Sequence, residues 1–470
     1  MLKSMNLAII NVCSFLQKRI GSLYNYHIIS MKRRKFITTG ALAAAALPSV
    51  FSIPSKAFGI APSEKINIGV IGCNSMGWHN TTSTLQLPEV NLLGICDVDQ
   101  NVIERRTGDY KQIRDNKPIQ YSDYRKLLDD KNIDAVIIGT PDHWHCKMMV
   151  DAVRAGKHVY VEKPVSNTIE ECNIMVKAAH ETGMVVQTGQ WQRSGSHYKK
   201  VKKIVESGIL GDIRLVKNWA YQAQMKSIPV LPDTPVPDGV DYDFWLGPAP
   251  KRPFNKNRFH QDFRWFWDYA GGLMTDWGVH QVDIALWVMG VDAPKSVMAS
   301  GGKIAYPNDA AETPDTLQAV FEYDGFNMLW EHAVGIDNGP YGRREGIAFI
   351  GNYATLIVNR NGYEVVVEDR VEGPKEKLKS IGFVPKPKHQ DYLGFHTKNF
   401  IDAIKANDSS LLNTPIESGS IAAVNALMGN VAYRTGRKIN WDNQTQSFIG
   451  DKEASDMIKA SYNNGWKVSR

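Results

Sequence analysis

One segment constrains the fold of this 470-residue chain more than any other, an apolar run that leads directly into a glycine turn. Residues 65–72 are rich in β-branched side chains, which predicts a buried parallel strand. The turn Gly72-Cys-Asn-Ser-Met-Gly77 follows, and a helical stretch comes after it. Gly72 permits a tight turn and Gly77 permits close packing of helix on strand. Asn74 replaces the second glycine of a G-x-G-x-x-G pattern, and asparagine tolerates positive φ, so the pattern is weakened but not lost.

The next strand ends in an acid that bears on the ligand of this turn. Backbone N–H groups at a helix start bind phosphate. Asp97 closes residues 90–97, 25 residues after Gly72, near the spacing of a carboxylate that binds adenosine ribose hydroxyls. Asp99 adds negative charge and no Arg or Lys follows until Arg105, which favours NAD over NADP. The alternative is that Asp97 only caps the next helix. The cofactor residues predicted here are Gly72, Asn74, Ser75, Met76, Gly77 and Asp97.

Strands and helices continue to alternate along the first part of the chain. Strands are predicted at 134–140, 158–162 and 184–188, with helices at 145–155 and 168–183. This alternation predicts an α/β domain with a doubly wound parallel sheet, a Rossmann domain, over residues 64–189. Ligands bind at the carboxyl ends of such strands. The further residues expected at the cofactor are Thr140, Pro141, Asp142, His143, His145, Glu162, Lys163, Gln190, Trp191 and Arg193.

Metal binding is the alternative for His143 and His145. No second carboxylate or histidine cluster with matching placement stands out, and no Cys-x-x-Cys pair is present. We therefore expect no metal, and a loop beside the nicotinamide instead.

The second half of the sequence has a different pattern from the first. Residues 213–221, 316–323 and 356–360 alternate with period 2, as half-solvated strands do. A long loop is predicted at 226–264 and helices at 396–406 and 418–435. We expect an α+β domain over 190–395, helices packing back on the body over 396–447, and a tail over 448–470.

The first 57 residues carry eight basic and no acidic side chains, so the positive balance of the chain belongs to them. Residues 31–57 combine Arg33-Arg34, an Ala-rich run and small residues, which predicts a twin-arginine signal peptide and a periplasmic protein. The alternative to a signal peptide is an uncleaved anchor or a basic cytoplasmic tail. Residues 1–30 are interpreted as a mis-called extension. The remaining chain has no basic surplus and no apolar run of membrane-spanning length, which disfavours nucleic acid and a stable membrane span.

With Glu162-Lys-Pro164 a specific family motif is present, and the chain resembles the Gfo/Idh/MocA oxidoreductases over about residues 64–445. The resemblance also includes the Gly72 turn, Asp97, Thr140-Pro141, Asp276-Trp-Gly-Val-His280 and residues 432–441. It implies a Rossmann domain followed by a domain with a large, open, mostly antiparallel sheet, assembled as a homodimer or homotetramer. It implies catalytic roles for Lys163, Asp276 and His280.

The chemistry of these three residues is consistent with those roles. Asp276 and His280 are four apart, so on a helix they share a face and one can orient the other, with a mere surface pair as the alternative. His280 is the natural base near neutral pH, and Lys163 at a strand end can assist the proton transfer. Substrate contacts are predicted at Tyr221, Arg264, Trp265, Asp276, His280, Tyr341 and Arg343, with core or loop packing as the alternative for the aromatic and arginine positions.

An exported enzyme meets little free nucleotide, so the NAD is expected to be tightly bound and recycled in place. The first reading is an oxidoreductase that oxidises a CH–OH carbon of a sugar or glycoside, plausibly C3, to a ketosugar that a keto-glycoside hydrolase partner cleaves. The second is an NAD-dependent, redox-neutral glycoside hydrolase resembling α-N-acetylgalactosaminidase, a group in which an apolar residue usually stands at the position of Lys163. A non-catalytic sugar-binding module, and a cytoplasmic dehydrogenase with freely exchanging NAD, are the remaining readings.

Overall fold

The computed structural model describes residues 65–370 and 378–469. The predicted leader over residues 1–57, with its export signal, lies outside the described residues. Across 65–370 and 378–469, no helix combines the length and the apolarity that crossing a membrane requires.

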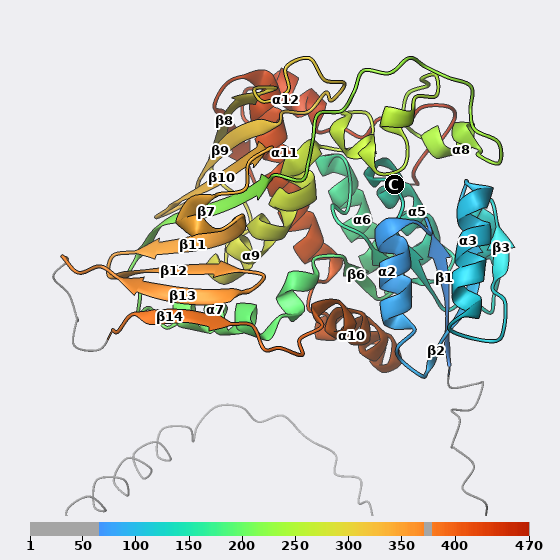
Figure 1. Cartoon of the computed structure of the whole chain (residues 1–470), viewed down its shortest axis with the longest axis horizontal. Helices are drawn as coiled ribbons and strands as arrows, with labels where there is room; N and C mark the ends of the chain where they lie inside the picture. The colour runs from blue at the N-terminus through green and yellow to red at the C-terminus, as the bar shows by residue number, and fades with distance from the viewer. Residues whose placement is uncertain (1–64, 371–377, 470) are drawn as a thin grey trace, which may run out of the picture. The chain divides into compact units, whose positions relative to one another are not determined.

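The first domain is organised around a parallel sheet, as predicted (Figure 1). Within the described residues it has six strands in the order β3-β2-β1-β4-β5-β6, the doubly wound arrangement of dinucleotide-binding domains. Every residue of β4 is buried, because helices cover both faces of the sheet. The strands are β1 (Ile66–Ile71), β2 (Val90–Cys96), β3 (Ile119–Tyr121), β4 (Ala135–Ile138), β5 (His158–Val161) and β6 (Val186–Thr188). The helices are α2 (Ser75–Thr84), α3 (Gln100–Lys111), α4 (Tyr124–Asp129), α5 (Asp142–Arg154) and α6 (Ile169–Thr182).

Local sequence fixes where several of these helices begin and end. The Asp99 carboxylate accepts a hydrogen bond from the N–H of Asn101 and caps α3, and Thr168 caps α6 through the N–H of Glu171. Helix α6 ends where Gly183 takes the left-handed conformation at φ 67°. The cap of α3 is thus Asp99, so the interpretation of Asp97 as a mere helix cap is wrong.

The second domain contains a large sheet, ten-stranded over the described residues, in the order β14-β13-β12-β11-β7-β10-β9-β8-β15-β16. All of its neighbouring pairs are antiparallel except β7 with β10, which confirms the expected mostly antiparallel sheet. Its strands are β7 (Ile213–Gln222), β8 (Ser296–Gly302), β9 (Thr316–Glu322), β10 (Asn327–Val334), β11 (Glu345–Gly351), β12 (Ala354–Asn359), β13 (Gly362–Val367), β14 (Ile381–Pro385), β15 (Ile439–Asp442) and β16 (Ser447–Phe448).

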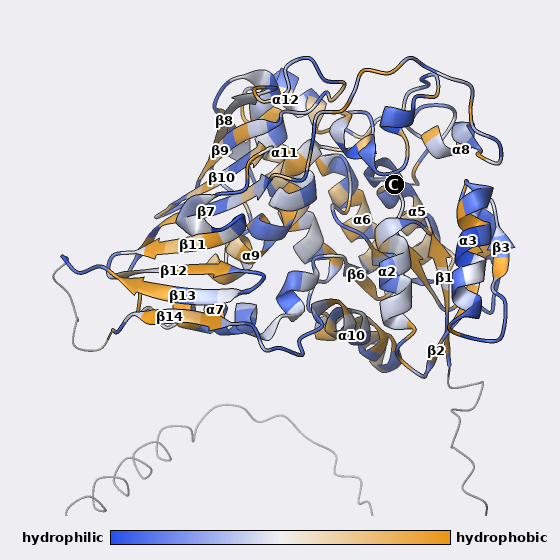
Figure 2. Cartoon of the chain, viewed as in Figure 1, coloured by the Kyte–Doolittle hydropathy of each residue, from blue (hydrophilic) through white to orange (hydrophobic). Residues whose placement is uncertain are grey.

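Helices join the two domains into one body. Helix α11 packs on α6 of the first domain as well as on α9 and β8, and α10 packs on α2. A single apolar core therefore runs from the parallel sheet to the large sheet, and Figure 2 shows apolar residues following the strands of both. The helices of this part are α7 (Ser196–Glu206), α8 (Tyr242–Leu246), α9 (Val279–Met289), α10 (Tyr392–Ala406), α11 (Ile416–Thr435) and α12 (Lys452–Met457).

The long loop predicted at 226–264 crosses from β7 to the first domain, where it forms α8 (Figure 1). Its backbone is bonded there, since the N–H of Asp241 donates to Val98 O at 2.9 Å and the N–H of Gln100 donates to Gly239 O at 2.9 Å. The second domain thus supplies a cover for the carboxyl end of the parallel sheet.

Candidate active site

The turn between β1 and α2 leaves no room for side chains at its glycines. Gly72 has φ 79°, and a Cβ there would lie 2.7 Å from the backbone N of Thr140. A Cβ on Gly77 would lie 1.9 Å from the carbonyl oxygen of Gly72. Asn74 is extended at φ −92°, and the positive φ falls on Ser75 at 40° instead, so the asparagine needs no unusual backbone. The turn therefore keeps the close backbone approach that a pyrophosphate requires.

A cavity of about 360 Å³ lies against this turn. Asp97 lines it, accepting hydrogen bonds from the N–H of Cys73 at 2.9 Å and of Asp99 at 3.1 Å. Burial raises the pKa of Asp97, while these two N–H groups and His260 lower it. The predicted cofactor residues that line the cavity are Gly72, Asn74, Ser75, Met76, Asp97, Thr140, Pro141, Asp142, His145, Glu162 and Lys163.

Aromatic side chains from the crossing loop and from α5 form the other side of this cavity. Trp144 of α5 is buried, and its indole N–H donates to Trp245 O at 2.9 Å. Trp466, near the end of the chain, packs edge-on against Trp144 at 4.8 Å and against Phe244 at 5.4 Å. The walls of the cavity thus come from the first domain and the crossing loop, and Trp466 packs behind Trp144 and Phe244. The aromatic residues that line the cavity are Tyr124, Trp144, Phe244, Trp245, Phe259 and Phe263.

A charged cluster lies where the cofactor cavity meets a second one. The ammonium of Lys163, after β5, donates to Asp276 Oδ1 at 2.8 Å and to Asp276 O at 2.9 Å. Arg264 Nε donates to the same Oδ1 at 3.3 Å. Burial alone would raise the pKa of Asp276, but Lys163 and Arg264 hold it well below its usual range. Asp276 is therefore a carboxylate that positions two cations.

His280 lies beside this cluster with a free imidazole. Burial lowers its pKa well below its usual range, and the charges of Lys163 and Arg360 lower it further, so the ring is neutral near pH 7. Nδ1 is buried and has no hydrogen-bond partner among the described residues. Asp276 and His280 were predicted to pair on one helical face. Residues 274–278 form a π-helical turn ahead of α9, which alters that spacing, and Asp276 faces Lys163 instead.

Two further carboxyl groups support the cluster from the first domain. Glu162 accepts from Asn80 Nδ2 at 2.7 Å and from the N–H of Lys163 at 3.1 Å, which orients the Lys163 backbone. Burial raises the pKa of Asp142 to about 7, although Arg264 and Lys163 lower it. His145 lies between Pro164 O, 2.7 Å from Nδ1, and Thr140 O, 2.8 Å from Nε2, and burial lowers its pKa to about 4, so the neutral ring donates to one of these two oxygens.

The second cavity, about 1140 Å³, opens beyond Lys163 and Arg264. Of the predicted substrate contacts, Arg264, Trp265, Asp276 and His280 line it, and so does Trp191, which was predicted at the cofactor. Trp277 and Arg360 also line it and were missed by the sequence analysis. Trp277 could have been found because it directly follows Asp276, whereas no local sequence signal distinguishes Arg360.

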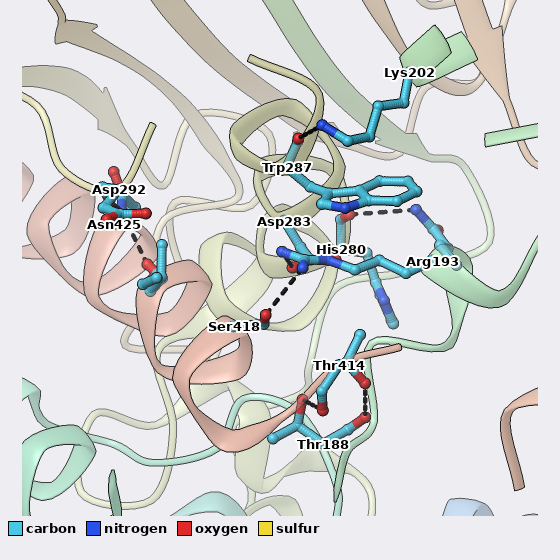
Figure 3. A network of polar contacts seen from close by, with 12 residues as sticks. Thr188, Arg193, Lys202, His280, Asp283, Trp287, Asp292, Thr414, Ser418 and Asn425 are labelled. Atoms are coloured by element: carbon cyan, nitrogen blue, oxygen red, sulfur yellow. Dashed lines mark hydrogen bonds and ion pairs between the residues drawn. The ribbon is translucent and has the colours of Figure 1, made fainter. Parts of the chain in front are cut away.

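Several predicted residues do not line either cavity. Arg193 forms a bidentate ion pair with Asp283 of α9 at 2.7 and 3.0 Å and donates to Ser418 Oγ at 2.9 Å, and its guanidinium lies over Trp287 (Figure 3). This buried pair holds α9, and hence His280, against α11. Gln190 is fully buried.

The remaining predicted residues have structural contacts elsewhere. His143 packs on Trp245 and lines a separate pocket. Tyr221 lies on β7 beside Glu331, and Tyr341 packs near Trp219 with its centroid at 5.6 Å. Arg343 pairs with Glu364 at 2.6 Å.

A metal site would require several ligating side chains close together. Over residues 65–370 and 378–469, no group of three or more His, Cys, Asp or Glu side chains is arranged to hold a metal ion. The chemistry of the cluster is that of a base, a lysine and paired carboxylates beside a dinucleotide cradle.

Comparison with curated proteins yields relatives at moderate identity. An uncharacterized oxidoreductase, YrbE, of Bacillus subtilis is 29% identical over 260 residues, 55% of this chain and 63% of that protein. An alpha-N-acetylgalactosaminidase of Shewanella oneidensis is 28% identical over 211 residues, 41% of this chain and 45% of that protein. The matches thus span less than two thirds of either relative.

Solved structures share the fold across most of the chain. A levoglucosan dehydrogenase in complex with NADH and levoglucosan superposes with a TM-score of 0.61 at 17% identity, covering 80% of this chain and 99% of that one. An aldose–aldose oxidoreductase from Caulobacter crescentus gives a TM-score of 0.60 at 17% identity, again over 80% of this chain and 99% of that one. At such identity the likeness shows the fold.

Family models account for both domains. Residues 66–190 match the oxidoreductase family, NAD-binding Rossmann fold. Residues 194–338 and 371–468 match the oxidoreductase family, C-terminal alpha/beta domain. The chain therefore belongs to the Gfo/Idh/MocA oxidoreductase family, and its first domain is an NAD-binding Rossmann domain.

Proposed function

We propose that this protein is an exported oxidoreductase that oxidises a CH–OH carbon of a carbohydrate, at C3, with tightly bound NAD. The observation that carries the proposal is the position of Lys163, which lines both the enclosed cofactor cavity and the larger cavity beside His280. Indole faces in that larger cavity suit the C–H faces of sugars, and its acidic and amide groups suit hydroxyls.

The chain's own groups account for the proton transfer. Bound NAD supplies the hydride acceptor. The sugar hydroxyl donates its proton to the neutral imidazole of His280 at Nε2, since Nδ1 is enclosed. The ammonium of Lys163 stabilises the negative charge that develops on the oxygen, while Asp276 fixes that ammonium at 2.8 Å. The aromatic cover excludes water from the cofactor.

The enclosure of the cofactor cavity supports retention of NAD between turnovers. The backbone bonds of the crossing loop and the packing of Trp466 on Trp144 hold this cover in place over the cofactor cavity. An enzyme that keeps its nucleotide must reoxidise the resulting NADH in place, either with a second sugar or by returning the hydride to the same substrate.

Return of the hydride to the same substrate defines the alternative function, a redox-neutral glycoside hydrolase. The relative from Shewanella oneidensis carries the name of such a hydrolase, which favours this candidate. Lys163 favours the oxidoreductase, because in the hydrolase group that this chain resembles an apolar residue usually stands at its position.

One experiment separates the candidates. Purified protein without added cofactor is mixed with glucosides, galactosides, N-acetylhexosaminides and inositols while reduced nicotinamide absorbance is followed. We expect a stoichiometric burst with an oxidised, intact sugar. Aglycone released over many turnovers without a net absorbance change would identify the hydrolase. Binding of sugar with neither signal would identify a non-catalytic module.

Location and assembly are separate proposals. We propose export through the Arg33-Arg34 signal, tested by changing both to lysine and measuring periplasmic protein, with unchanged export contradicting it. We propose a homodimer or homotetramer through the outer face of the large sheet, where apolar side chains are about half exposed. Scattering by the purified protein at several concentrations would detect a monomer if this is wrong. The exposed apolar side chains are Leu215, Met298, Val366 and Phe383.

A further inference from the structure

Arg360 is the first residue after β12, in the tight connection to β13, and its backbone is held on both sides. Its N–H donates to Glu345 Oε1 at 3.0 Å, and its carbonyl oxygen accepts from the hydroxyl of Tyr392 at 3.3 Å. The side chain therefore enters the larger cavity from a fixed point on the large sheet.

Two indole rings flank the guanidinium. Its central carbon lies 4.5 Å from the ring centroid of Trp191 and 4.4 Å from that of Trp277. Nε donates to Gln192 Oε1 at 2.8 Å, and Gln192 is fully buried. With its faces covered and Nε occupied, the group presents only the edge that carries its two terminal nitrogens.

That edge has no protein partner. Lys163 and Arg264 share Asp276, but Arg360 forms no ion pair with any described residue, and its Nη1 and Nη2 donate to none of them. Burial lowers the pKa of Arg360 from its usual range, and Glu345 raises it again, so the group keeps its charge. Glu345 and Asp276 are anionic neighbours of Arg360, but neither accepts a hydrogen bond from its terminal nitrogens, which leaves those N–H groups for a ligand.

The vacant edge is close to the reacting centre. The rings that flank Arg360 also contact His280, with centroid separations of 5.9 Å for Trp191 and 6.4 Å for Trp277. The same two rings thus border both groups, and a monosaccharide placed beside His280 would lie next to the free edge of Arg360.

We infer that Arg360 binds a carboxylate on the sugar, so that the substrate is a uronic acid or a glycosiduronate. This inference rests on the proposed function and adds the substrate class to it. A carboxylate is planar and matches the fork of a guanidinium edge with two parallel N–H···O bonds.

The charge of the cavity favours a monoanion over a phosphate. Four aspartates besides Asp276 line the cavity, and its cations are Lys163, Lys226, Arg264 and Arg360, so the cavity has no cationic surplus to hold a dianion. The four aspartates are Asp262, Asp309, Asp315 and Asp391.

Binding of a carboxylate there would also tune the base. The positive charge of Arg360 lowers the pKa of His280, and Asp276 raises it. A substrate carboxylate on Arg360 offsets its charge and raises the pKa of His280, which makes the imidazole a stronger base only when the anionic sugar is in place.

The test compares matched pairs of sugars on the purified full-length protein with its bound nucleotide. The pairs are p-nitrophenyl β-D-glucuronide with the glucoside and the galacturonide with the galactoside, and glucose 6-phosphate is the phosphate probe. We expect kcat/KM to favour each uronide. Arg360→Gln should reduce that preference roughly 10- to 100-fold, and Arg360→Lys, which keeps charge but not the fork, should reduce it less.

Arg214→Gln is the matched control, because Arg214 is exposed on β7 of the same sheet, and it should leave the preference unchanged. Preference for neutral sugars, or for the phosphate, overturns the inference while leaving the proposed function in place. If no sugar produces a burst or aglycone release, the proposed function fails, and calorimetric titration with glucuronate then decides whether Arg360 binds carboxylates. Equal glucuronate affinity of the wild type and Arg360→Gln also overturns the inference.

Discussion

The two cavities that meet at Lys163 are built in different ways. The cofactor cavity of about 360 Å³ is made largely by loops that follow consecutive strands of one sheet, covered by aromatic side chains. The cavity of about 1140 Å³ takes its walls from α2, the crossing loop, the π-helical turn, the connections that follow β8 and β12, and the start of α10. The first is defined by short motifs along one sheet, whereas the second combines one motif, residues 276–280, with residues that only tertiary packing brings together.

Their charges differ as well. Carboxylates at the cofactor cavity are bonded within the protein, as Asp97 and Glu162 illustrate. The larger cavity contains the unpartnered edge of Arg360 and the unpartnered Nδ1 of His280. The terminal nitrogens of Arg360 thus remain available to a ligand in this cavity.

The variant His280→Ala tests whether the two cavities have separate roles, and it is expected to have the largest effect on turnover. Loss of the base should lower turnover by about 10²–10⁴-fold while nucleotide stays bound, because His280 lines only the larger cavity. Turnover and nucleotide content are measured on the same preparation. His389→Ala, on an exposed histidine, is the control. Unchanged turnover would refute the assignment of the base.

Lys163→Met should lower turnover by about 10²-fold, since Lys163 lines both cavities. It should also shift the pH profile. Lys163 lowers the pKa of His280, so its removal raises that pKa, His280 stays protonated to higher pH, and the acid limb of kcat/KM moves to higher pH. A pH–rate profile of both proteins measures this shift. A shift to lower pH would contradict the electrostatic coupling.

Asp97→Asn addresses the cofactor cavity alone. Loss of the negative charge should weaken NAD binding by roughly 10-fold and reduce discrimination against NADP, with little change in sugar KM. Titration of the nucleotide-depleted protein with both dinucleotides measures the ratio. Asp99→Asn, at the helix cap, is the comparison variant. An unchanged NAD/NADP ratio would show that Asp97 acts only on the turn.

The smallest effect is expected from Trp466→Ala. Removing this ring from Trp144 and Phe244 should speed nucleotide loss several-fold, with the chemistry of the bound state retained. Nucleotide retained after extended dialysis is the measurement, and Phe395→Ala, on an exposed aromatic, is the control. Equal retention in both would show that the cover does not hold the cofactor.

The first domain could be predicted in detail because its signals are local. The Gly72 turn, the β-branched strands and the alternation with helices each constrain neighbouring residues, and the parallel sheet confirms them. The second sheet was only partly visible, since a strand such as β11, buried at almost every position, lacks the alternation of a half-solvated strand.

Site residues differ in the same way between those that local sequence signals place and those that tertiary packing places. Lys163 and Asp97 are at strand ends, where topology alone brings them to a ligand. Arg193 was assigned to the cofactor on the same argument, but its ion pair with Asp283 depends on how α9 packs. Arg360 is a hairpin residue among many, and only the fold brings it to Trp191 and His280.

The crossing loop has a consequence for the autonomy of the two domains. Part of the wall of the NAD-binding domain belongs to its neighbour, because Val240 is bridged to Asp99 and Trp144 packs against Phe244 and Trp466. A fragment limited to residues 65–190 would leave Trp144, now 2% exposed, open to water. The dinucleotide-binding unit of this protein is therefore not a detachable module, and transplanting it into another dehydrogenase would require moving the loop and the chain end with it.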